Sequence, residues 1–198
     1  MKRSLAIIAL GTVFLSTAAF AQSAGEKTGV NSALGIAPKT EDFIKEAAMS
    51  DMLEIEAAKI AQQKGNATEK TFAGQMITDH TKTSSELKGM VSGDMKAAIP
   101  TALDDSSQKK LDKLTKTKPE DFASEYDPMQ VSAHKDAVSL FQRYAEGGAD
   151  AKLSQAASAG AADRGRPTRC ASPPREPAPA RGHSRGPRRR ARERPRRG

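Results

Sequence analysis

The chain has 198 residues and a formal net charge of +8, which is not spread evenly along its length. Residues 161–198 carry a net +10, from thirteen Arg and three acidic residues, whereas residues 1–160 carry a net −2. The basic character therefore belongs to the last fifth of the chain, and the composition excludes a strongly basic body. The only cysteine, Cys170, lies in the same last fifth, which excludes disulfides and thiol chemistry from the body.

Residues 1–21 have the pattern of an export signal. A positive Lys-Arg pair follows the first Met, and residues 5–15 form an apolar run that is too short to span a bilayer. Ala19 and Ala21 match the small residues that precede a signal-peptide cleavage site. We predict a signal peptide with cleavage after Ala21, and a periplasmic or secreted protein whose mature chain has no transmembrane segment. An uncleaved membrane anchor is the alternative.

The first helix of the mature chain is predicted to begin at Thr40. Residues 22–40 are rich in Gly, Ser and other small residues, and this composition predicts a flexible lead-in. Thr40 can cap a helix, and Gly65 and Asn66 end it. The apolar residues between them recur at three- and four-residue steps, as on one face of a helix. They are Phe43, Ala47, Leu53, Ala57, Ile60 and Ala61.

A second helix is predicted from about Thr68, and Ser92-Gly93 breaks it. Its inward stripe comprises Phe72, Met76, His80, Leu87 and Met90. The chain is less regular between Ser92 and Thr117, where Asp104-Asp105 predicts the start of a short Lys-rich helix.

The third long helix is predicted to begin near Pro119, a residue that fits the first turn of a helix. Pro128 is expected to kink this helix or to restart it. Gly147-Gly148 ends it, and Asp150 begins a last helical segment that loses its apolar pattern at Gly160. The stripe of the third helix comprises Val131, His134, Val138, Phe141 and Ala145.

These segments predict an all-α fold. Alternation of β-branched residues never lasts four positions, so no strand is predicted. Long amphipathic helices joined by short turns indicate an up-down four-helix bundle over residues 41–159, in which the fourth long helix is incomplete.

Residues 160–198 are predicted to form a disordered basic tail, because they cannot bury enough apolar surface to offset chain entropy. A nucleic-acid-binding arm is disfavoured by the export signal and by the lack of aromatic residues among the arginines. Nonspecific binding to polyanions or to a membrane surface is a second interpretation. The composition favours a third, frame-shifted translation, because residues 1–160 hold seventeen Lys and two Arg whereas the tail holds no Lys.

Three side chains of the body are candidate metal ligands: Glu54, His80 and His134. Both histidines fall on the apolar stripes, and Glu54 borders the stripe of the first helix, so the three groups converge if the helices pack side by side. Two imidazoles and a carboxylate suit Zn, Fe or Cu. Histidines that pack in the core and hydrogen-bond there are the alternative.

No catalytic residue and no organic-cofactor site is predicted. A ferritin-type di-metal site needs a Glu three residues before a His on each of two helices, but Ile77 and Val131 occupy those positions. The chain also lacks a Gly-rich phosphate loop, a paired-Cys metal motif and a nucleophile elbow.

The body resembles a bacterial exported family known as domain of unknown function 4142. The resemblance is carried by DFIKEAAMSDMLEIEAAKIAQQKGNATEKTFAGQMITDHTKTSSELK and MQVSAHKDAVSLFQRYAEGG, and runs from about Asp42 to Ala159. It implies a signal peptide and a ferritin-like bundle whose complete fourth helix carries its own His. This chain departs after about Ser158, and His183 lies in the wrong context to replace that His. The matching positions are Phe43, Glu54, Glu56, Phe72, Met76, Asp79, His80, His134 and Phe141.

The sequence thus predicts an exported, non-enzymatic bundle that binds a metal or a small ligand and acts in envelope or stress physiology. The alternatives are a ferritin-like metal-dependent oxidase, and a protein that binds polyanions or membrane surfaces through its tail. A homo-oligomer or an envelope partner is expected, and a specific nucleic-acid partner is not.

Overall fold

The computed structural model of the chain describes residues 23–164. The predicted signal peptide and the tail beyond Arg164 lie outside the described residues.

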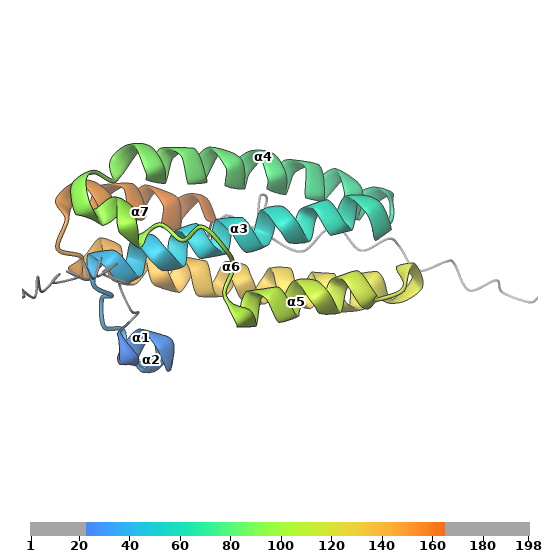
Figure 1. The fold of residues 1–198 in the computed structure, drawn as a ribbon, viewed down its shortest axis with the longest axis horizontal. Coiled ribbons are helices and arrows are strands. Elements are labelled where there is room, and N and C mark those ends of the chain that lie inside the picture. The colour runs from blue at the N-terminus through green and yellow to red at the C-terminus, as the bar shows by residue number, and fades with distance from the viewer. Residues whose placement is uncertain (1–22, 165–198) are drawn as a thin grey trace, which may run out of the picture.

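Every element between residues 23 and 164 is helical, which confirms the predicted all-α fold (Figure 1). Four longer helices form the bundle: α3 (Thr40–Lys64), α4 (Ala67–Met90), α6 (Phe122–Gly147) and α7 (Ala151–Arg164). The other elements are α1 (Ala24–Lys27), α2 (Val30–Leu34), the 3₁₀-helix η1 (Gly93–Ala98), α5 (Asp105–Lys116) and the 3₁₀-helix η2 (Pro119–Asp121).

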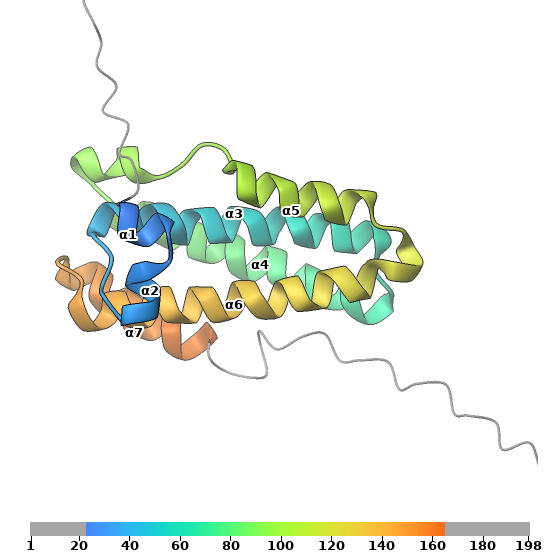
Figure 2. The same cartoon turned by 90° about the horizontal axis from the view of Figure 1, so that it is seen from below.

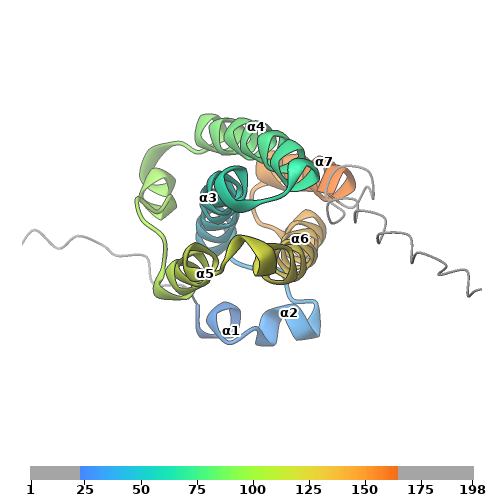
Figure 3. The ribbon, with the colours of Figure 1, turned by 90° about the vertical axis from the view of Figure 1, so that its right-hand side faces the viewer.

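Helix α3 lies at the centre of the arrangement. The end-on view places it between α4, α5 and α6, with α7 beside α4 and α6 (Figure 3). Helix α7 has 14 residues, whereas α3, α4 and α6 have 25, 24 and 26. It therefore covers only one end of the bundle, as the shortened fourth helix of the prediction implies.

The core is divided into two apolar clusters, one at each end of the bundle. The α7-side cluster includes Phe43, Leu87, Leu140, Tyr144 and Leu153. The α5-side cluster includes Leu53, Met76, Leu114, Phe122 and Tyr126. Each fully buried large side chain stabilises the fold by roughly 1.5–3 kcal/mol, so both clusters are needed to hold the long helices together.

A tight turn joins α3 to α4. Asn66 Oδ1 accepts a hydrogen bond from Glu69 N at 2.9 Å, and Glu69 Oε2 accepts one from Asn66 N at 2.7 Å. This capping box satisfies backbone donors that the first turn of α4 leaves open. A Cβ at Gly65 would lie 2.8 Å from Glu69 Cβ, so the turn needs a residue without a side chain there.

Two features of α6 and α7 differ from the sequence-based expectation. Of the two expectations for Pro128, a kink or a restart, the restart is wrong, because α6 runs continuously from Phe122 to Gly147. The fully buried Tyr126 and Gln130 lie on either side of the proline. Helix α7 continues past Gly160 to Arg164. A Cβ at Gly160 would lie 2.8 Å from the Phe141 ring, so the glycine permits close packing and does not end the helix.

The lead-in, which is predicted to be a flexible segment, contains two short helices. Helices α1 and α2 lie on the outer side of the bundle, near the end where α3 begins, and α2 lies beside α6 (Figures 2 and 3). Contacts of the lead-in with Asp42 and Arg143, far along the chain, hold it there. The residues that make these contacts do not lie in a local apolar pattern, so helical periodicity did not predict the contacts.

Among the helices of residues 23–164, none combines the length and the apolar character that crossing a membrane requires.

Replacing Asn66 with Ala tests the capping box. The substitution removes the acceptor for Glu69 N and should lower the free energy of unfolding by about 1 kcal/mol in urea denaturation. Ser92→Ala is the matched control, because Ser92 precedes η1 without a side-chain cap bond and should leave the midpoint unchanged. Equal effects of the two variants would contradict the role given to Asn66.

Candidate functional site

The two histidines of the body point into the bundle from two different helices. His80 on α4 and His134 on α6 are 4% and 6% exposed, and their ring centroids lie 5.9 Å apart in an edge-to-face arrangement. The apolar stripes therefore placed both rings correctly in the interior.

His80 is held by a carboxylate that the sequence analysis missed. Asp51 on α3 is 2% exposed, and its Oδ1 lies 2.8 Å from His80 Nδ1. Asp51 Oδ2 accepts hydrogen bonds from Thr83 Oγ1 at 2.9 Å and from Ser84 Oγ at 3.3 Å. Asp51 follows Ala47 by four residues, so it lies on the inward stripe of α3. A carboxylate at such a position was the sequence signal that could have identified it as a buried partner.

His134 uses its ring differently. Its Nδ1 lies 2.9 Å from the backbone oxygen of Gln130, one turn earlier on α6. A carbonyl oxygen can only accept, so His134 Nδ1 carries the hydrogen and donates it. This bond fixes the ring orientation relative to α6.

Glu54, the third predicted ligand, is 1% exposed and is engaged by Gln130. Gln130 Nε2 donates to Glu54 Oε2 at 2.6 Å, which links α3 to α6. Gln130 thus contacts Glu54 with its side chain and His134 with its backbone.

These groups form one polar layer between the two apolar clusters. We define the polar layer as Asp51, Glu54, His80, Gln130 and His134, all of which are buried. On α3, α4 and α6 alike, its members lie between residues of the α5-side cluster and residues of the α7-side cluster. The layer therefore crosses the bundle near its middle.

A buried phenol lies next to the polar layer. Burial, and then the charges of Glu54, Asp127 and Glu69, raise the pKa of Tyr126 well above its usual value. The hydroxyl therefore stays protonated, and it has no hydrogen-bond partner among the described residues. A buried polar group without a partner is destabilising.

Each of the three predicted ligands has a hydrogen-bond partner in this geometry. Asp51 engages His80, and Gln130 engages both Glu54 and His134. Between residues 23 and 164, no group of three or more His, Cys, Asp and Glu side chains is arranged to hold a metal ion. The metal site through Glu54, His80 and His134 therefore stays a prediction from the sequence.

A cleft of about 490 Å³ opens at the α7 end of the bundle. Its walls come from α3, α4, α6 and α7, and its apolar lining includes Phe43, Leu87, Met90, Phe141 and Ala156. The polar lining residues are Asp51, Asp79, Lys82, Thr83 and Glu86. Asp51 therefore belongs both to the polar layer and to the cleft wall. Sequence periodicity missed the cleft, because it arises where α4 and the short α7 are not packed together.

The fold and this interior define the chain as an all-helical bundle protein. The family described as domain of unknown function (DUF4142) matches residues 25–163, which is most of the chain, and the chain belongs to this family. The match includes α2 and extends almost to the end of α7. Neither a curated protein nor a solved structure matches the chain.

The two buried tyrosines allow a matched test of the polar interior. Tyr144 Oη lies 2.9 Å from Thr40 Oγ1, whereas the equally buried hydroxyl of Tyr126 lacks a partner within the described part of the chain. Tyr144→Phe should lower the free energy of unfolding by about 1 kcal/mol, and Tyr126→Phe should leave it unchanged or raise it. Urea denaturation of both variants gives the comparison, and an equal loss in both would refute the difference.

Proposed function

We propose that this protein is exported to the periplasm and acts there as a non-enzymatic binder of a small, largely apolar molecule, in the cleft at the α7 end of the bundle. The observation that carries the proposal is the cleft of about 490 Å³ with apolar walls and a polar edge. Ligand sites in proteins are commonly concave, mainly apolar, and about 300–1,000 Å³ in volume.

The lining suggests how a ligand would lie. Phe43, Phe141 and Ala156 offer an apolar surface from three helices. Asp79 and Lys82 stand at the polar edge, where the Lys82 side chain is mostly exposed. A molecule with an apolar body and one polar end matches this division, with the polar end toward α4.

The buried polar groups favour binding over catalysis. Asp51 already accepts from His80, Thr83 and Ser84, so its carboxylate is committed to holding α3 against α4. A ferritin-like oxidase would need a set of clustered ligands that residues 23–164 do not provide. We therefore place that alternative below ligand binding.

Filling the cleft tests the proposed binding. Ala156 lines the cleft, so Ala156→Phe should reduce the affinity for the fluorescent probe N-phenyl-1-naphthylamine by about tenfold or more, because the added ring occupies apolar volume. Ala151→Phe is the matched control, since Ala151 is exposed on α7 and does not line the cleft. Titration of probe fluorescence, with circular dichroism to verify folding, gives the affinities. Equal probe affinity in both variants would exclude this cleft as the site.

Export is tested separately by processing of the N-terminus. The protein recovered from the periplasm should begin at Gln22, as determined by mass spectrometry. Ala21→Leu should block cleavage because the residue before the cut must be small, whereas Ala18→Leu should be processed normally. An unprocessed chain confined to the cytoplasm in the wild type would contradict the proposed compartment.

A further inference from the structure

The large apolar side chains that residues 23–164 expose are gathered in one stretch of the lead-in. Val30, Leu34 and Ile36 are 50%, 68% and 48% exposed, and they are the exposed large hydrophobic residues of the described chain. Val30 and Leu34 are four residues apart on α2, a spacing that puts them on one face of the helix. We call these three side chains the α2 patch.

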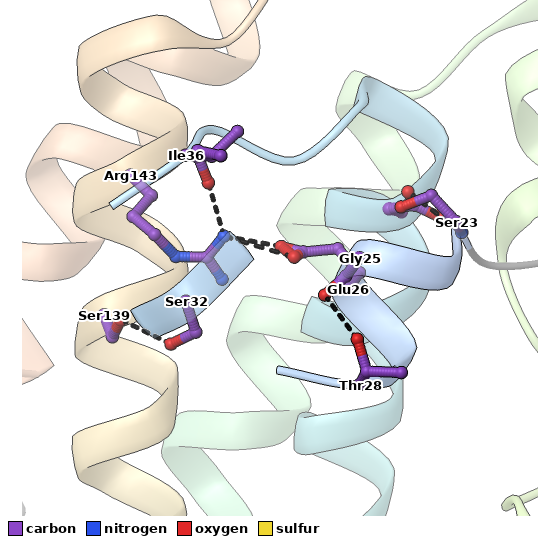
Figure 4. A network of polar contacts seen from close by, with 9 residues as sticks. Ser23, Gly25, Glu26, Thr28, Ser32, Ile36, Ser139 and Arg143 are labelled. Atoms are coloured by element: carbon purple, nitrogen blue, oxygen red, sulfur yellow. Dashed lines mark hydrogen bonds and ion pairs between the residues drawn. The ribbon is translucent and has the colours of Figure 1, made fainter. Parts of the chain in front are cut away.

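Hydrogen bonds attach the segment that carries the α2 patch to the bundle. Arg143 on α6 is 7% exposed, and its Nη1 donates to Glu26 Oε1 at 2.5 Å and to Oε2 at 3.2 Å (Figure 4). The same nitrogen donates to the backbone oxygen of Ile36 at 2.7 Å. One guanidinium therefore fixes both α1 and the residue that carries the last side chain of the patch.

Further contacts hold α2 between these two points. The hydroxyls of Ser32 on α2 and Ser139 on α6 lie 3.3 Å apart (Figure 4). Gly29 and Gly35, at the two ends of α2, have φ of 75° and 68°, which few other residues adopt readily. The lead-in thus presents its apolar side chains to solvent in a defined conformation, although burying them would be favourable.

The exposed charged side chains within residues 23–39 are lysines. Lys27 and Lys39 flank the α2 patch and are exposed. Glu26 is the acidic residue between positions 23 and 39, and it is buried and paired with Arg143. Apolar side chains flanked by lysines are the combination that favours the surface of a bilayer containing anionic lipids.

We propose that the α2 patch binds the surface of an anionic membrane, with Val30, Leu34 and Ile36 entering between the headgroups and the two lysines contacting lipid phosphates. Helix α2 lies on the outer side of the bundle, on the side away from α4 (Figure 3). Three aliphatic side chains are far fewer than a stable protein–protein interface of about 1,600 Å² needs. A bilayer, in contrast, accepts a small projecting patch. The proposal does not depend on a ligand in the cleft.

The absence of Trp from the whole sequence makes a direct test available. Leu34→Trp puts a single reporter in the patch, and Ser85→Trp puts one on the exposed side of α4. On addition of vesicles made of equal parts phosphatidylglycerol and phosphatidylcholine, emission from position 34 should shift to the blue and be quenched by brominated lipid, whereas emission from position 85 should not change. No response at position 34, or an equal response at both positions, would overturn the proposal.

A second measurement separates the patch from the basic tail, which also attracts anionic lipid. The full chain and its Val30→Ser/Leu34→Ser variant, with identical N-termini verified by mass spectrometry, are compared by vesicle flotation at low and high salt. The variant should partition about tenfold or more weakly at both salt concentrations, because the loss is apolar and is not screened. Ala33→Ser, on the same helix, should behave as the wild type.

Two outcomes of these experiments would overturn the proposal in favour of another occupant. If the wild type and the double variant partition equally to vesicles, membrane binding is due to the tail and not to the patch. A blue shift at position 34 that depends on protein concentration without vesicles, together with a dimer in sedimentation, would assign the patch to a second copy of the chain.

Discussion

The hydrogen bond between Asp51 and His80 is the contact around which the bundle is organised. It joins α3 to α4 at the point where one apolar cluster ends and the other begins, with an Oδ1–Nδ1 separation of 2.8 Å. A shift of either helix by one turn would leave these buried polar groups without partners, at a cost of about 1–3 kcal/mol for each. Apolar packing alone is more tolerant of such shifts, so the polar layer gives the bundle its register. In the same way, the hydrogen bond from Gln130 to Glu54 fixes the position of α6 relative to α3.

The sequence predicted well those features that depend on local pattern. Helix α3 begins at Thr40 as predicted, but Thr40 does not cap it, because Lys39 occupies the N-cap position and makes no side-chain cap bond. The N-cap of α5 at Asp104 and the inward direction of both histidines follow from capping chemistry and helical periodicity. These signals lie within one or two turns of the residues that they concern, and the structure confirms them.

Features that depend on distant contacts were not predictable in the same way. Glu26 and Arg143 are 117 residues apart, and neither lies in an apolar pattern that indicates their pairing. Asp51 occupies an inward position of α3, but periodicity does not say which donor on another helix will meet it. Gly160 resembles the end of a helix in the sequence, and only the Phe141 ring beside it explains why α7 continues. The proposed metal site depended on the same kind of information, namely which partner each buried group finds.

The short α7 connects the architecture of the bundle to its cleft. Helix α7 packs on α6 and contributes Leu153 and Ala157 to the core, and its described part runs from Ala151 to Arg164. The opening that remains beside α4 is lined by both apolar and polar residues. The cleft therefore lies where α4 faces α7, and α3 and α6 also contribute to its walls.

The contact between Gly160 and Phe141 has a consequence for the size of that opening. The ring lies over the bare backbone of α7 and at the same time packs edge-on against Phe43, with ring centroids 5.2 Å apart. Both aromatic rings line the cleft, so their positions determine how deep it is. A single methyl group on the glycine would push the Phe141 ring away from α7. The shape of this cleft therefore depends on the absence of a side chain at Gly160.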